Sequence, residues 1–199
     1  PAHMAGGSYP GDPSELRAFL DGQFTREGGP GERPSCNGST ERPPRCLIVP
    51  HIDYHRGGHA YAHGYLRLAR GAAPDTVFIF GVAHAGPPVP FVLTRKHFET
   101  PLGTLDTDRE AVGLLEAACA WDPYEFEIVH RTEHSIELQA VMLAHLFGSS
   151  VRIVPILCGS LLDPEADPPA IRSDAAAFLT TCRELVNTPG RCACVIAAA

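Results

Sequence analysis

Residues 76–84, TVFIFGVAH, carry the clearest indication of the fold, because a buried strand is followed directly by a chemically active residue. The apolar and β-branched run 76–80 predicts a strand that is buried on both faces, as in a sheet covered by helices. Gly81 ends the predicted strand, and His84 follows three residues later. Ligand sites in open α/β sheets lie beyond the carboxyl ends of the strands. We therefore expect His84 at the rim where such a site forms.

Alternating strands and helices surround this stretch. Strands are predicted at 46–49, 91–93, 151–157 and 192–199, and helices at 15–24, 59–70, 109–121, 133–147 and 171–186. Ser14, Thr132 and a capping box that begins at Thr107 are the expected helix caps. The run 46–49 is continuously apolar and also predicts a strand buried on both faces. This alternation indicates a layered α/β domain with a mainly parallel or mixed central sheet.

The chain divides at residue 45 in this interpretation. Residues 1–45 contain an N-terminal tail, one short helix and a Gly/Pro-rich connection, and residues 46–199 form the α/β domain. Within the tail, we interpret Pro1-Ala2-His3-Met4 as a remnant of cloning that leads into a native Met4, and we expect residues 5–13 to be frayed.

Composition excludes several classes of function. The chain has 199 residues and a formal net charge of −7, without a run of Lys or Arg, so we expect neither nucleic acid nor a membrane surface as a partner. We find no apolar stretch long enough to span a bilayer and no signal-peptide pattern. The seven cysteines are scattered and odd in number, which favours reduced thiols in a cytoplasmic protein.

Two of the ten histidines follow predicted strands. His51 comes shortly after the run 46–49, as His84 comes after the run 76–80, so both imidazoles are expected where neighbouring strand ends meet. A hydrogen-bonded rim residue is the alternative for each. His51, His55, His59 and His63 also recur every four residues, but Pro50 and the pair Gly57-Gly58 are expected to break any helix before His59. We therefore expect a helix surface at His59 and His63, and no metal-binding stripe.

His134 stands at the start of the predicted helix 133–147. Its face continues at Leu138 and Val141, so the ring is expected to point inward. An imidazole near a positive helix end stays neutral more readily, which suits acid/base chemistry; a satisfied core histidine is the alternative. We expect Glu133 and Glu137 to be solvent-facing carboxylates of the first turn.

These residues together resemble a known family. The order Pro50-His51-x-x-Tyr54, Gly57-Gly58, Gly81-x-x-His84, Thr100-Pro-Leu-Gly103 and Glu133-His-Ser-Ile-Glu137 is similar to that of the Memo-like proteins, which include the bacterial AmmeMemoRadiSam system protein B. The resemblance implies the three-layer α/β/α fold of class III extradiol dioxygenases, with a mononuclear metal at the strand ends.

The resemblance also implies roles for single residues. His51 and His84 match the two histidine ligands of the family, and His134 matches a histidine that would act as an acid/base beside the metal. The implied cofactor is a divalent metal, Fe(II) first, with Cu or Zn as alternatives. Ala83 and Ala85 flank His84 where the family often has polar residues.

Family members continue past the last strand with an Asp-x-x-His motif and a third ligand. We therefore expect the native polypeptide, or a partner chain, to carry the rest of the domain beyond Ala199, and we expect Ala199 to sit inside the domain, near His51 and His84.

The resulting hypothesis is a non-haem iron-dependent oxygenase or redox enzyme that acts on a small molecule or a peptide. One alternative is a non-catalytic iron- or copper-binding or protein-interaction protein on the same fold. A metal-dependent hydrolase is a further alternative.

Overall fold

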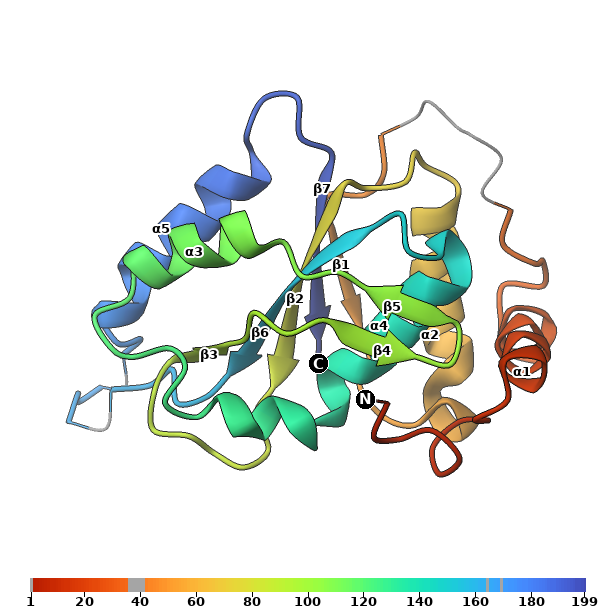
Figure 1. Cartoon of the computed structure of the whole chain (residues 1–199), viewed down its shortest axis with the longest axis horizontal. Helices are drawn as coiled ribbons and strands as arrows, with labels where there is room; N and C mark the ends of the chain where they lie inside the picture. Colours follow the sequence, from red (N-terminus) through yellow and green to blue (C-terminus); the bar gives the residue numbers. More distant parts are fainter. Residues whose placement is uncertain (1, 36–41, 164, 169) are drawn as a thin grey trace.

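A computed structural model describes residues 2–35, 42–163, 165–168 and 170–199. In this part of the chain, a central five-stranded sheet stands between two layers of helices (Figure 1). The strands of this sheet are β1 Cys46–Val49, β2 Thr76–Val82, β3 Phe91–Leu93, β6 Arg152–Cys158 and β7 Ala193–Ala198. The helices are α1 Pro13–Thr25, α2 Tyr54–Ala69, α3 Arg109–Ala117, α4 His134–Phe147, α5 Asp174–Val186 and the short 3₁₀ helix η1 Glu127–Arg131. The predicted three-layer α/β/α class with a mixed sheet is confirmed.

The sheet has the order β1-β7-β2-β6-β3. Every neighbouring pair is parallel except β3, which runs antiparallel to β6. The last strand, β7, therefore lies between β1 and β2. The strands that precede His51 and His84 were expected to be neighbours, and they are not. Since β1 and β2 still point the same way, their carboxyl ends open on one edge of the sheet.

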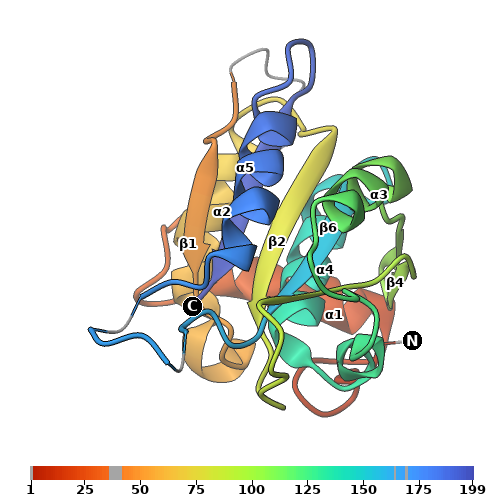
Figure 2. The ribbon, with the colours of Figure 1, turned by 90° about the vertical axis from the view of Figure 1, so that its left-hand side faces the viewer.

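The two helical layers cover opposite faces. Figure 2 shows α5 in front of the sheet and α2 behind it. The helices α1, α2 and α4 share one apolar core, whereas α3 and α5 build a second one on the other face. Leu16, Leu20 and Phe24 of α1 are fully buried in the first core. Helix α1 is thus packed into the α/β body.

Strand β1 differs from its prediction. It lies at the edge of the sheet, and only Val49 of its residues is buried, while the Ile48 side chain is 77% exposed. An apolar run cannot by itself distinguish an edge strand from a central one, because both satisfy the same local pattern. The hairpin of β4 Phe98–Thr100 and β5 Gly103–Leu105 was not predicted, since its strands have three residues each.

Helix α2 begins five residues earlier than predicted and runs through Gly57 and Gly58. A Cβ atom on Gly57 would lie 2.4 Å from Cγ2 of Ile52, and one on Gly58 would lie 2.4 Å from Oε1 of Gln23. The glycine pair therefore allows α1 and the preceding loop to pack closely against α2, and it does not end the helix. His55, His59 and His63 consequently share one helix.

The predicted helix caps are displaced by one or two residues. Asp12, Asp108 and Glu133 cap α1, α3 and α4 in place of Ser14, Thr107 and Thr132, and each accepts a hydrogen bond from a backbone amide of the first turn. Carboxylates at these positions satisfy free amides and also favour the positive end of the helix. Helix α5 begins at Asp174, three residues later than predicted, and α3 ends at Ala117, four residues earlier.

The N-terminal segment is part of the fold, contrary to expectation. The backbone amides of His3 and Met4 donate to the Glu137 carboxylate, and Tyr9 is almost completely buried. No helix in the described residues has the length and apolar character of a membrane span. Six cysteines fall within the described residues and are unpaired, whereas Cys36 lies outside them.

Candidate metal centre

Three histidines meet at the carboxyl edge of the sheet. His51 lies two residues after β1, His84 lies two residues after β2, and His134 is the first residue of α4. One potential ligand atom from each residue lies within 4.8 Å of the others, and among the described residues this is the only group of its kind. The ring centroids of His51 and His84 are 5.2 Å apart, and those of His84 and His134 are 4.8 Å apart.

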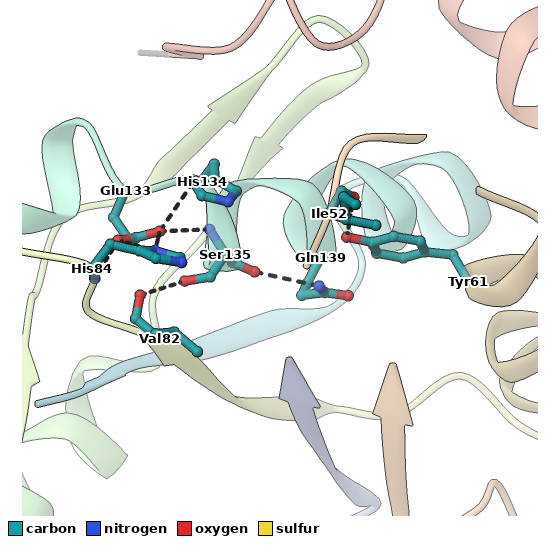
Figure 3. A network of polar contacts seen from close by, with 8 residues as sticks. All are labelled: Ile52, Tyr61, Val82, His84, Glu133, His134, Ser135 and Gln139. Carbon is teal, nitrogen blue, oxygen red and sulfur yellow. Dashed lines mark hydrogen bonds and ion pairs between the residues drawn. The ribbon is translucent and has the colours of Figure 1, made fainter. Parts of the chain in front are cut away.

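Because Gly81 has no side chain, helix α4 can approach strand β2 closely. A Cβ atom on Gly81 would lie 2.6 Å from both Cγ1 of Ile136 and Oγ of Ser135, so a larger residue would push the start of the helix away. The Ser135 hydroxyl also donates to the Val82 carbonyl at 3.0 Å (Figure 3). Gly81 and Ser135 thereby place His134 next to His84.

Gln139 connects helix α4 to the loop that follows strand β1. Its Nε2 donates to the Pro50 carbonyl at 3.0 Å, one residue before His51, and its Oε1 accepts a hydrogen bond from Tyr65 at 2.8 Å. Gln139 is fully buried, so the loss of these hydrogen bonds would leave polar atoms without water. Helix α4 therefore fixes both histidine-bearing loops relative to each other.

Glu133 is buried beside the histidines, contrary to the prediction of a solvent-facing carboxylate. Its oxygens accept from His84 Nδ1 and from the backbone amides of His84 and Ser135, each at 3.0 Å, and one oxygen lies 3.3 Å from His134 Nδ1 (Figure 3). Burial opposes ionisation of Glu133, but the hydrogen bonds from His84 and Ser135 outweigh it and lower its pKa. An ionised Glu133 fixes the ring of His84 so that Nε2 is left for another partner.

The hydrogen bonding and protonation of His51 suit metal binding. His51 Nδ1 is buried and has no hydrogen-bond partner among the described residues. Burial, followed by the neighbouring His84 and His134, lowers the pKa of His51, so the ring is neutral at neutral pH. Neutral imidazole nitrogens are ligands for Fe, Cu and Zn alike. These residues fit a divalent metal ion.

A cavity of about 530 Å³ opens beside the histidines. His51 and His134 line it together with Ala199, whose amide donates to the Val49 carbonyl at 2.9 Å. Ala199 thus lies at the rim of the candidate centre, as expected, but it is exposed and does not sit inside the domain as the sequence predicted.

Sequence reasoning found the three histidines and missed their surroundings. It expected two metal-binding histidines in this chain, whereas the structure places a nitrogen of His134 in the same group. Glu133 and Gln139 were not recognised as parts of the centre. The spacing of Glu133, Ser135 and Gln139 was available as a signal, because all three stand within two turns of His134 on one helix.

The fold and the histidine cluster define an α/β protein with a candidate metal centre at the carboxyl edge of its sheet. A family model described as Memo-like protein matches residues 1–180, and the chain belongs to this family. A MEMO1 family protein of Ignicoccus hospitalis is 39% identical over 159 residues, which are 79% of this chain and 55% of the relative.

Two further relatives are a MEMO1 family protein of Methanopyrus kandleri, 36% identical over 77% of this chain, and one of Sulfolobus acidocaldarius, also 36% identical over 77% of this chain. The matches cover 54% and 55% of these relatives. The chain therefore spans about half the length of the curated relatives it matches.

Proposed function

We propose that the chain carries the mononuclear metal centre of a non-haem iron-dependent oxygenase or redox enzyme. The observation that supports this most is the convergence of three imidazole nitrogens within 4.8 Å at the edge of the sheet. His51 and His84 would hold the metal, which would supply binding positions for dioxygen and a substrate when bound. Membership of the Memo-like family is consistent with this proposal.

The remaining polar residues have distinct roles in the proposal. Glu133 accepts a hydrogen bond from the Nδ1–H group of His84 and so orients Nε2 toward the metal position. His134 stands at the amino end of α4 and lines the cavity, where it would accept a proton from a bound substrate and return it later. The position of His134 also allows a third metal–nitrogen bond, and metal content in a variant distinguishes the two roles.

Oxygen consumption tests the proposed activity. The protein would be loaded anaerobically with Fe(II), mixed with a panel of catechols and exposed to oxygen, with His84→Ala as the variant that loses the metal. We expect oxygen uptake that depends on both catechol and iron and is absent in His84→Ala. A protein that binds iron stoichiometrically but consumes no oxygen with any catechol would favour the non-catalytic metal-binding alternative.

A further inference from the structure

The cavity beside the histidines has one cationic group whose hydrogen-bonding capacity is largely unused. Arg56 lines this cavity, and its Nε donates to the Asp53 carboxylate at 2.6 Å. In the described part of the chain, neither Nη atom of Arg56 forms a hydrogen bond with a cavity residue, and the side chain is 71% exposed. Both Nη groups of Arg56 are therefore available to donate hydrogen bonds to a ligand.

The rest of the cavity lining is mainly apolar. Met4, Pro50, Ile52 and Leu138 supply most of it, and the histidines lie on the same surface. A ligand that fills this cavity would therefore bury an apolar body, which is favourable because apolar surface is removed from water.

The N-terminal segment supplies one wall of the cavity, and a buried carboxylate holds this wall in place. Met4 and Ser8 line the cavity from that segment. Glu137 accepts from the Tyr9 hydroxyl at 2.5 Å and from the Met4 amide at 2.8 Å. Burial, followed by the hydrogen bond to Glu137, raises the pKa of Tyr9, so Tyr9 remains a neutral donor. The wall is therefore formed before any ligand arrives.

We infer that this cavity binds a small organic carboxylate, with its apolar body against Met4, Ile52 and Leu138 and its carboxylate on the free edge of Arg56. Arg binds carboxylates through paired, charge-assisted hydrogen bonds, which are about twice as strong as neutral ones. Since Asp53 is the single carboxylate among the described residues that pairs with Arg56, an anion is favoured over a neutral isostere. The inference rests on the proposed function in that it makes this anion the substrate of the metal centre.

A binding measurement on metal-free protein tests the inference without the metal. The ligands are 2-naphthoate and its neutral isostere 2-naphthamide, and the dissociation constants come from ¹⁵N NMR titrations. Arg56→Gln removes the cation, and Arg67→Gln makes the same change at an exposed position of the same helix, outside the lining of the cavity. Met4→Ala shortens the apolar wall and leaves the backbone hydrogen bond to Glu137 in place.

We expect wild-type protein to bind the carboxylate about tenfold more tightly than the amide. The preference should vanish in Arg56→Gln and persist in Arg67→Gln, while Met4→Ala weakens both ligands equally. Equal affinities in wild type, a preference that survives in Arg56→Gln, or no binding of either ligand would overturn the inference.

A parallel Co(II) titration keeps this result apart from the proposed function. Cobalt binding without an Arg56-dependent preference refutes only the inference. An Arg56-dependent preference in a protein that binds no cobalt refutes only the proposed metal centre.

Discussion

Glu133 and Glu137 lie one helical turn apart at the start of α4, yet they stabilise different parts of the molecule. Both are buried, with 6% and 5% of their surface exposed. Glu133 binds His84 and the first turn of the helix, whereas Glu137 binds Tyr9 and the amides of the N-terminal segment. The comparison shows that the same residue type, at the start of the same helix, orients His84 of the candidate metal centre in one case and fixes a wall of the adjacent cavity in the other.

The largest expected effect comes from the removal of His134, which lies beside Glu133 in the candidate centre. His134→Ala should leave the metal content near that of wild type and reduce turnover by about 10² to 10⁴, which is the usual contribution of a general acid/base. Metal analysis and oxygen uptake would be measured on the same sample. Loss of the metal in this variant would instead make His134 the third ligand.

The two glutamates themselves give the next largest contrast. Glu133→Gln should weaken metal affinity by about 10- to 100-fold, because the residue that orients a ligating histidine loses its charge. Glu137→Gln, the matched control one turn away, should change the affinity by less than about threefold, since it contacts none of the three histidines. Competition with a chromophoric chelator measures both affinities. Equal losses in the two variants would refute the division of roles.

Tyr9→Phe tests the contact between Glu137 and the N-terminal segment. The change removes the hydrogen bond from the Tyr9 hydroxyl to the buried Glu137 side chain, and we expect the free energy of unfolding to fall by about 1 to 3 kcal/mol. Urea denaturation followed by circular dichroism measures this difference. Metal affinity should stay unchanged, and a Tyr9→Phe protein that lost its metal would contradict the account.

Ser135→Ala has the smallest expected effect and tests the contact between α4 and β2. Without the Ser135 hydroxyl, the Val82 carbonyl loses one hydrogen bond, so we expect a loss of about 1 kcal/mol in the free energy of unfolding. Gly81→Ala is the matched steric change, because its new methyl group would collide with Ile136 and Ser135. We expect Gly81→Ala to be the more destabilising of the two by urea denaturation.

The sequence predicted the fold class and the three histidines because both depend on short-range patterns. The runs 76–80 and 192–199 satisfy the local pattern of a buried strand, and His51 and His84 follow strands directly. The position of β7 between β1 and β2 could not be predicted, because strand order depends on packing between segments that are far apart in the sequence.

The burial of the two glutamates was missed for the same reason. Their partners are His84, 49 positions away from Glu133, and Tyr9, 128 positions away from Glu137. In a local helical pattern, each carboxylate is indistinguishable from an ordinary charged residue of a first turn.

Metal stoichiometry tests the central claim, that His51 and His84 of the histidine cluster hold a divalent metal, most directly. Anaerobic Co(II) titration of the chain, followed by visible absorption, should give one ion per chain. His51→Ala and His84→Ala should abolish this binding. His63→Ala, at an exposed position of α2 where Nε2 lies 3.0 Å from the Gly28 carbonyl, should preserve it. A chain that takes up no stoichiometric cobalt, or that loses it equally in His63→Ala, would contradict the account.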